Sequence, residues 1–264
     1  MQVRDLGAID RPLLVFGGAY SNYQALQALF EHAEALGFAD DQLIQTGDIA
    51  GYCAQPQACL DAIAQRGILG IAGNVELSLA EGADDCGCGF EDGSACDVLS
   101  RGWYPFAQAH VNAAARRFMA DLPGMLRFTH YGRRVAVLHG GAQDVSAFIW
   151  PDDPDERFRV EIEALGGVDI VLAGHCGLSF QRRIDGVDWI NAGVIGLAPN
   201  DGQPATRFGV LNAQGFHLET LHYDHESAAA QMRPAGLTQG YDTALLSGHW
   251  PSEDILPPSL RRHD

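Results

Sequence analysis

The sequence lacks any apolar run of the roughly 18 residues that a membrane-spanning helix requires. Residues 1–16 also lack a basic start followed by a long apolar stretch and a small-residue cleavage site, so we expect no secretory signal. Basic residues are scarce, with 17 Lys plus Arg against 34 Asp plus Glu and a formal charge of -17. This charge repels nucleic-acid backbones and anionic membrane surfaces, and we therefore expect neither partner.

A regular disulfide framework is also missing. The six cysteines, at positions 53, 59, 86, 88, 96 and 176, form no ladder for a chain of this size, which favours a reducing compartment and predicts a cytoplasmic protein. Cys86, Cys88 and Cys96 lie in an acidic, glycine-rich segment and lack the paired CxxC units of a structural zinc site. A loop disulfide, free thiols and a metal cluster all remain open for them.

The hydrophobic content is sufficient for a large core. The chain has 264 residues, of which 47% are hydrophobic and 19% charged, so we expect one large domain or one domain with additions. Short apolar runs alternate with segments of helical periodicity, which predicts crossover units of a parallel sheet and an α/β fold. The predicted elements of this first half are strands at 13–16, 43–45 and 68–72 and helices at 22–36 and 56–66.

The pattern changes after residue 80. Residues 81–102 are predicted to form an inserted loop, and a helix is predicted over 105–122. Two hairpins are expected, with turns at Tyr131-Gly132 and Asp185-Gly186. The remaining predicted elements are a helix at 155–165, strands at 169–174, 207–212 and 216–223, and one amphipathic helix in a tail that is otherwise loop-like from Asp224.

Four side chains that bind metals each follow an apolar run and sit in a glycine-flanked loop. The segments read QLIQTGDIAGY, ILGIAGNVE, RVAVLHGG and DIVLAGHCG, and the residues are Asp48, Asn74, His139 and His175. Because each falls where a buried strand ends, we expect them to form a single site. One carboxylate, one amide oxygen and two imidazoles suit Mn, Fe or Zn better than Mg or Ca, which prefer all-oxygen shells.

From Leu13 to about Tyr223 the sequence resembles the calcineurin-like metallophosphoesterases, and GDIAGYCAQPQACLDAI followed by GNVE is most like their small bacterial phosphodiesterase branch. The resemblance implies an α/β sandwich of two mixed β-sheets flanked by helices, with a two-metal centre at the strand ends. It predicts a domain over 1–225, including the insert at 81–102. Residues 226–264 would form a helical and irregular extension packed on the same domain.

Matched residue by residue, the family pattern survives only in part. Asp48 matches the bridging carboxylate, and Asn74, His139 and His175 match the ligands of the second metal. The ligands private to the first metal are absent, because the expected motifs read FGGAYSN and GHCG and place Gly18, Tyr20 and Gly177 in the ligand slots. The resemblance therefore predicts one divalent transition metal (Mn, Fe or Zn).

The family's catalytic histidine is also absent, since Val75 occupies its slot; general acid catalysis contributes about 100-fold or more where it operates. Glu76, which follows, either orients a water or caps the next helix. Tyr20 either donates a hydrogen bond to phosphate, binds metal as a phenolate, or fills the space of the lost metal. INAGVIG resembles the family's Asn-x-Gly-Ser stretch. The predicted catalytic residues are Tyr20, Asn74, Glu76 and His139, and the predicted substrate contacts are Tyr20, Asn22, Asn191 and Gly193.

These features predict hydrolysis of a phosphomonoester or phosphodiester by a water that the metal activates. One alternative is a catalytically silent protein of the same fold that binds a phosphate or nucleotide ligand. Another is a mononuclear iron redox enzyme, because two histidines and a carboxylate also occur at non-haem iron sites. The expected partner is a small phosphorylated substrate or ligand, and a homo-oligomer is compatible with the sequence.

Overall fold

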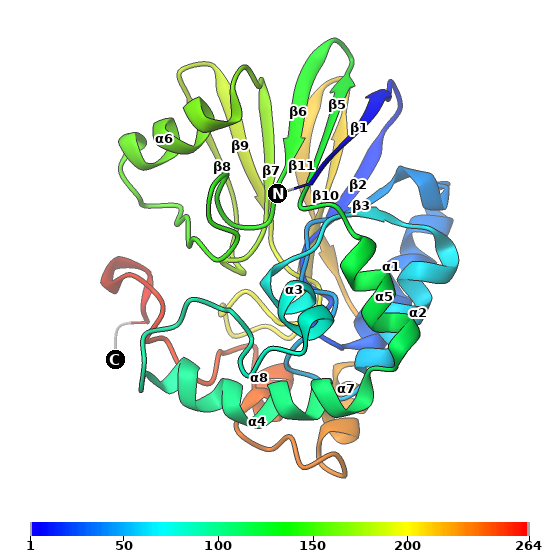
Figure 1. Cartoon of the computed structure of the whole chain (residues 1–264), viewed down its shortest axis with the longest axis vertical. Helices are drawn as coiled ribbons and strands as arrows, with labels where there is room; N and C mark the ends of the chain where they lie inside the picture. The colour runs from blue at the N-terminus through cyan, green and yellow to red at the C-terminus, as the bar shows by residue number, and fades with distance from the viewer. Residues whose placement is uncertain (1, 263–264) are drawn as a thin grey trace.

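Two β-sheets pack against each other and carry helices on their outer faces (Figure 1). The computed structural model describes residues 2–262. The strands are β1 (Val3–Ala8), β2 (Leu13–Phe16), β3 (Leu43–Gln45), β4 (Leu69–Gly70), β5 (Met125–His130), β6 (Arg133–Val137), β7 (Ile170–Ala173), β8 (Ser179–Ile184), β9 (Val187–Ala192), β10 (Thr206–Asn212) and β11 (Gly215–Leu221). The α-helices are α1 (Tyr23–Ala35), α2 (Pro56–Arg66), α3 (Asn74–Glu81), α4 (Ala95–His110), α5 (Ala113–Asp121), α6 (Asp155–Leu165), α7 (His225–Met232) and α8 (Tyr241–Ser247).

Both sheets are mixed, as predicted. The five-stranded sheet has the order β11-β10-β2-β3-β4, and the six-stranded sheet has the order β1-β5-β6-β7-β9-β8. β2, β3 and β4 run parallel and are joined by α1 and α2, which confirms the two predicted crossover units. α1 begins at an Asn22 cap that accepts a hydrogen bond from the Ala25 amide at 3.1 Å, and α2 begins with Pro56.

The six-stranded sheet contains the two predicted hairpins. β5 pairs with β6 and β8 with β9, both antiparallel. The turn residues Tyr131, Gly132, Asp185 and Gly186 all have positive φ, which suits tight two-residue turns whose twist matches that of the strands. β6, β7 and β9 run parallel, so the carboxyl ends of β6 and β7 meet at one edge.

The core has three parts, set by the alternation of side chains along the strands. In β2, Leu13 and Val15 face the space between the sheets, whereas Leu14 and Phe16 pack against the helices of the five-stranded sheet. The six-stranded sheet packs its outer face against Phe158 and neighbouring apolar residues of α6. The loops at the strand ends are thus held by apolar packing on both faces of each sheet.

Parts of the prediction were wrong. Residues 81–102 are not a loop throughout, because α4 begins at Ala95, where the Ser94 side chain accepts a hydrogen bond from the Asp97 amide at 3.2 Å. The helix predicted over 105–122 is two helices, separated where Val111 is extended and Asn112 caps α5. β1 was not predicted because most of its side chains are exposed and no apolar alternation marks it. The strand predicted over 68–72 is reduced to β4.

The tail also differs from its prediction, since it forms two helices rather than one. Tyr241 and Leu245 of α8 belong to the same core as α1 and the five-stranded sheet. The Ala95 amide donates to the Asp254 carboxylate at 3.2 Å, so the last segment lies against the start of α4 (Figure 1). Among residues 2–262, no helix has both the length and the apolar character needed to cross a membrane.

Candidate functional site

The site lies where loops from the two sheets meet. Asp48 follows β3 and Asn74 begins α3 just after β4, so the five-stranded sheet supplies both. His139 follows β6 and His175 follows β7, so the six-stranded sheet supplies the other two. The structure thus brings together four residues that are as many as 127 positions apart in the sequence, and all four are buried.

The heteroatoms of these side chains converge on a common point. His139 Nε2 lies 3.1 Å from Asn74 Oδ1, 3.1 Å from His175 Nδ1 and 3.2 Å from Asp48 Oδ2. The ligand atoms of the three ionisable residues all lie within 4.8 Å of one another. Donor atoms held about 2.1 Å from a common ion lie roughly 3 to 3.5 Å apart, so the distances of 3.1 to 3.2 Å around His139 Nε2 fit a single metal.

Glycines next to the candidate ligands leave the space that these side chains occupy. A Cβ at Gly47 would lie 2.4 Å from His139 Nδ1, and one at Gly73 would lie 2.2 Å from Asp48 Oδ1. Asp48 and His175 themselves have φ of 59° and 62°, a left-handed conformation that non-glycine residues seldom adopt. Strain of this kind persists where the surrounding structure over-determines it, which is typical of functional sites.

The orientation of His139 is fixed by the backbone. His139 Nδ1 lies 2.6 Å from the carbonyl oxygen of Thr46. Because a carbonyl only accepts, Nδ1 carries the proton and donates it, and Nε2 is turned toward Asp48, Asn74 and His175. A backbone carbonyl bonded to the outer nitrogen is the usual arrangement of a histidine that binds metal.

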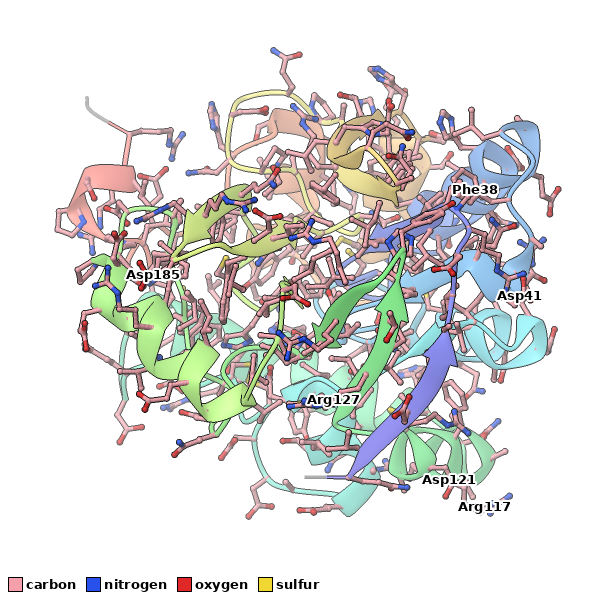
Figure 2. All side chains as sticks on the ribbon, turned by 90° about the horizontal axis from the view of Figure 1, so that it is seen from above. Phe38, Asp41, Arg117, Asp121, Arg127 and Asp185 are labelled. Carbon is pink, nitrogen blue, oxygen red and sulfur yellow. A yellow bond between two sulfur atoms is a disulfide. The ribbon has the colours of Figure 1, made fainter. Side chains whose placement is uncertain are left out.

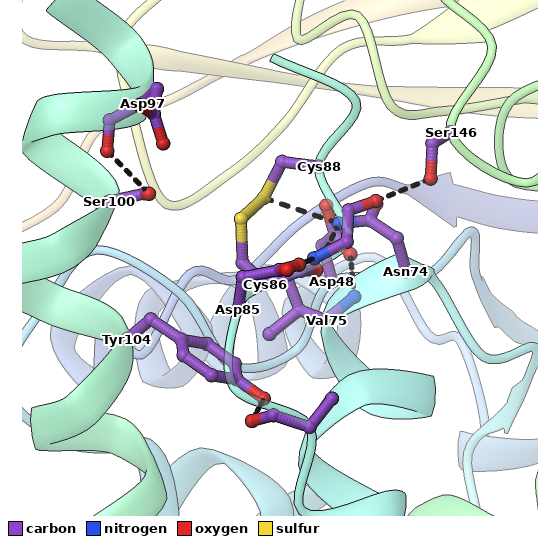
Figure 3. Close-up of a disulfide and its surroundings, with 12 residues drawn as sticks. Asp48, Asn74, Val75, Asp85, Cys86, Cys88, Asp97, Ser100, Tyr104 and Ser146 are labelled. Carbon is purple, nitrogen blue, oxygen red and sulfur yellow. Dashed lines mark hydrogen bonds between the residues drawn. A yellow bond between two sulfur atoms is a disulfide. The ribbon is translucent and has the colours of Figure 1, made fainter. Parts of the chain in front are cut away.

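The insert fixes the orientation of Asn74. Its amide nitrogen donates to the carbonyl oxygen of Cys86 at 3.0 Å and contacts Cys88 Sγ at 3.3 Å (Figure 3). These contacts leave Oδ1 facing His139. Cys86 and Cys88 are joined by a disulfide, the first of the three possibilities left open by the sequence. Cys96 is a free, buried thiol, so these three cysteines do not form a metal cluster.

The protonation states of Asp48, His139 and His175 are set by their burial and by their interactions with one another. Burial alone would raise the pKa of Asp48, but His139 and His175 outweigh it and hold that pKa below its usual range. Burial lowers the pKa of His139, but the charge of Asp48 and its hydrogen bond raise it overall. Burial and the neighbouring His139 lower the pKa of His175 to about 3. The carboxylate is therefore ionised at neutral pH, and His175 keeps a free lone pair, as a metal ligand requires.

Aromatic side chains occupy the space next to two of the positions whose ligands are absent. A Cβ at Gly18 would lie 2.5 Å from an atom of the Tyr20 ring, and one at Gly177 would lie 3.2 Å from the Trp250 indole. Burial and the neighbouring Tyr52 and Asp48 raise the pKa of Tyr20 well above its usual range, so Tyr20 is a neutral phenol. This finding favours space-filling and hydrogen-bond donation over a phenolate ligand.

The contact between Gly18 and Tyr20 leads to a stability prediction. Replacing Gly18 with alanine should lower the free energy of unfolding by about 1–3 kcal/mol, because the added methyl group overlaps the Tyr20 ring. In a Tyr20→Ser background the same change should cost at least about 1 kcal/mol less, since the ring is gone. Urea unfolding of the four proteins of this cycle measures the coupling. An equal cost in both backgrounds would contradict the proposed overlap.

Glu76 is engaged by the backbone. Its buried carboxylate accepts hydrogen bonds from the amides of Asp48 (2.7 Å), Gly73 (2.9 Å) and Ala50 (3.2 Å). Of the two roles that the sequence left open, this geometry favours capping of α3, and it also ties the Asp48 loop to that helix. No contact in the described chain points Glu76 toward the pocket, so a catalytic role stays a prediction.

Three of the residues predicted to contact substrate form hydrogen bonds within the protein. Asn22 caps α1 and donates to the carbonyl oxygen of Gly196 at 3.1 Å. Asn191 donates to the Gly174 carbonyl oxygen at 2.7 Å and accepts from the Gly193 amide at 2.9 Å, which anchors the loop that carries His175. Tyr20 lines the pocket beside the site, whereas Asn22, Asn191 and Gly193 do not. Substrate contact by these three stays a prediction without a supporting contact.

The pocket is lined largely by residues that the sequence did not single out. Its cavity volume, the space open to the centres of water molecules, is about 50 Å³. Tyr20, Asp48 and His175 border it together with residues of the insert, α4, the loop after β6 and the C-terminal tail. The tail carried no motif, and the expectation that it packs on the same domain was the one signal that pointed to it.

The arginines lie elsewhere. The chain has no lysine, so its 17 basic residues are all arginines. Those that form ion pairs include Arg133, Arg134, Arg182, Arg183 and Arg207. Figure 2 shows Arg117 and Asp185 at opposite edges of the molecule, and Arg117 is exposed. No arginine within residues 2–262 lines the pocket, so the site itself must supply any attraction for phosphate.

Comparison with known proteins gives consistent results. The model of the calcineurin-like phosphoesterase superfamily domain matches residues 15–215. An uncharacterized protein of Methanocaldococcus jannaschii is 22% identical over 233 residues, covering 81% of this chain and 88% of that protein. A metallophosphoesterase of Sphaerobacter thermophilus has a similar structure, with a TM-score of 0.72, 20% identity, and coverage of 91% of this chain and 100% of that one. A hypothetical protein of Pyrococcus horikoshii gives a TM-score of 0.76 at 16% identity, covering 90% and 98%.

Proposed function

This chain belongs to the calcineurin-like phosphoesterase superfamily, a family of hydrolases acting on ester bonds, and we propose that it hydrolyses a phosphomonoester or phosphodiester with a single divalent transition metal. The small phosphorylated substrate would bind in the pocket beside Asp48 and His175. Asp48, Asn74, His139 and His175 would hold the metal.

The observation that carries the proposal is the convergence of three donor atoms on His139 Nε2 at 3.1 to 3.2 Å. Two imidazoles, a carboxylate and an amide oxygen form a ligand set that suits Mn, Fe or Zn. Once bound, such a metal supplies a Lewis acid that polarises a phosphoryl oxygen and increases the acidity of water. His139 and Asn74 are held ready for this role by Thr46 and Cys86, so little side-chain ordering remains to be done on binding.

The residues around the four proposed ligands favour one metal over two. These ligands, hereafter the quartet, are Asp48, Asn74, His139 and His175. Gly18 and Gly177 offer no ligand, and the space beside them contains the Tyr20 ring and the Trp250 indole. Restoring side chains there would need both aromatic groups to move. The neutral phenol of Tyr20 is the group best placed to donate a hydrogen bond to a phosphoryl oxygen.

Metal analysis tests this proposal. Protein purified without chelators should contain about one equivalent of Mn, Fe or Zn per chain by mass spectrometry, and a His175→Ala variant should lose it, because removal of a ligand typically weakens metal binding strongly. His130→Ala is a matched control, since His130 is also buried but bonds the carbonyl of Arg11 outside the site. A stoichiometry near two, or metal retained by His175→Ala, would refute the mononuclear assignment.

A silent binding protein is the second candidate, and one observation favours it. Val75 stands where the family has its catalytic histidine, and its side chain is buried. In that case phosphorylated ligands would raise the melting temperature of the metal-loaded protein with no release of product. Turnover of bis(p-nitrophenyl) phosphate that depends on the quartet would exclude this candidate.

A further inference from the structure

The pocket beside the quartet has aromatic walls. The centre of the Tyr20 ring lies 4.6 Å from the centre of the Tyr52 ring. Tyr52 in turn stacks on Tyr241 of α8, with 4.3 Å between the ring centres and 10° between the ring planes. Phe148 lies 4.2 Å from the His175 ring, so an apolar surface directly adjoins a proposed ligand. Trp250 packs against both core clusters that border the pocket.

These walls are held rigidly. The Trp250 indole nitrogen donates to the carbonyl oxygen of Ala198 at 2.7 Å, and its backbone amide donates to Asn200 at 2.8 Å. Phe148 stacks on Trp150 with an angle of 4° between the rings. A surface fixed in this way binds a planar apolar group without having to order its own side chains, which improves affinity.

The pocket offers little to a charged or strongly polar ligand. Of its lining residues, Asp48 and His175 are the charged or basic ones, and no arginine within residues 2–262 joins them. A nucleotide with several phosphates would therefore meet no cation beyond the single metal. An overall charge of -17 adds repulsion at long range.

Among residues 2–262, the pocket lining also provides no suitable proton donor for a departing alcohol. Apart from the two proposed ligands, its titratable side chains are tyrosines and cysteines, which are weak acids. An alkoxide leaves only with an acid to protonate it, whereas a phenolate is stable enough to leave with much less help. The aromatic walls and the weak acidity of the lining side chains therefore both favour a phosphoester whose leaving group is a phenolate.

We propose that this pocket binds the uncharged aromatic group of an aryl phosphoester, an inference that rests on the proposed function and specifies its substrate class. The phosphoryl group lies at the quartet, and the aryl group lies among Tyr20, Phe148, Tyr241 and Trp250. Attack of water on phosphorus forms a P–O bond, the bond to the aryl oxygen breaks, and the phenolate leaves. The attacking water gives up its proton to solvent.

Binding of two non-hydrolysable phosphonates and one nucleotide to the metal-loaded protein tests this inference, and the nucleotide titration is checked for release of phosphate. Isothermal titration with methylphosphonate, phenylphosphonate and thymidine 5′-monophosphate should give a phenylphosphonate affinity at least about tenfold above that of methylphosphonate, because extra apolar groups gain this much in a fitted hydrophobic pocket. The nucleotide should bind no more tightly than methylphosphonate. Equal affinities for the two phosphonates, or tighter binding of the nucleotide, would overturn the inference.

Substitutions of Trp250 test whether the phenyl group binds at this side chain. Trp250→Ala should reduce the ratio of phenylphosphonate to methylphosphonate affinity to below about threefold, and Trp250→Leu should retain part of it because apolar bulk remains. Leu246→Ala is a control, since Leu246 is an exposed apolar residue of α8 outside the pocket lining and should leave the ratio unchanged. A ratio insensitive to Trp250 would reject the assigned location.

Turnover separates this inference from the proposed function. If bis(p-nitrophenyl) phosphate is hydrolysed but the phosphonates bind equally, the function stands and the aryl pocket is refuted. If phenylphosphonate is preferred and no ester is hydrolysed, the pocket stands as a ligand site and the phosphoesterase proposal is refuted.

Discussion

Replacing His139 with alanine should reduce the turnover of bis(p-nitrophenyl) phosphate at least about 1,000-fold, equivalent to roughly 4 kcal/mol of transition-state stabilisation. The reason is geometric, because His139 Nε2 is the atom to which Asp48, Asn74 and His175 all come within 3.1 to 3.2 Å. Its removal should eliminate both a ligand and the hydrogen bond to Thr46 that orders the loop after β3. The measurement is kcat/KM in protein whose metal content has been determined.

Two further variants distinguish a loss of catalysis from a loss of folding. Asp48→Asn serves as a second variant, because it preserves the size of the side chain while removing the charge. His130→Ala controls for the loss of a buried imidazole elsewhere and should keep most of the turnover. If His139→Ala retains more than about a tenth of the wild-type kcat/KM while remaining folded, His139 has no catalytic function.

Replacing Glu76 with alanine should lower the free energy of unfolding by about 3 kcal/mol. The change removes the acceptors of three amide hydrogen bonds, from Asp48, Ala50 and Gly73, and each buried N–H left unpaired costs about 1–3 kcal/mol. Burial and the nearby charge of Asp48 raise the pKa of Glu76 to about 7, so burying this carboxylate already has a cost. That cost is relieved by the substitution, and the net loss therefore lies near the lower end of the sum.

Denaturant unfolding measures this loss, and two further variants define its cause. Glu76→Gln should give an intermediate value, because its one acceptor oxygen satisfies part of the amide set. Glu81→Ala, on the exposed side of the same helix, should change stability by less than about 0.5 kcal/mol. If Glu76→Ala unfolds with nearly the wild-type free energy, the clamp between α3 and the Asp48 loop is unimportant for stability.

The elements near the site were predicted well because their signals are local. The strand at 43–45 and the helix at 56–66 agree residue for residue with β3 and α2, since a short apolar run and a first-turn proline are each contained within a few residues. Other boundaries depended on weaker signals. The start of α4 is set by one Ser94 cap in an acidic, glycine-rich segment, and β1 exists because β5 offers a partner for a mostly exposed strand.

The candidate site shows the same division. Asp48, Asn74, His139 and His175 were identified from glycine-flanked loops after apolar runs, because parallel strands place such loops at a common edge. No local sequence pattern indicated that the carbonyl group of Cys86 orients Asn74. None indicated that the Glu76 carboxylate accepts hydrogen bonds from three backbone amides. Those contacts join segments that are distant in sequence or depend on side-chain direction, and they become visible only when the sheets have packed.

By itself, the sequence determined the class of fold, the two crossover units, the hairpins and the four candidate donor side chains, because periodicity, turn chemistry and the order of motifs are properties of short stretches of chain. The tertiary structure decided what surrounds the donors. It brought Trp250 of the tail beside Gly177 and Phe148 beside His175, which turned the neighbourhood of the quartet into an aromatic pocket. Contacts of this kind depend on how three core clusters pack against one another, and packing is a property of the whole molecule.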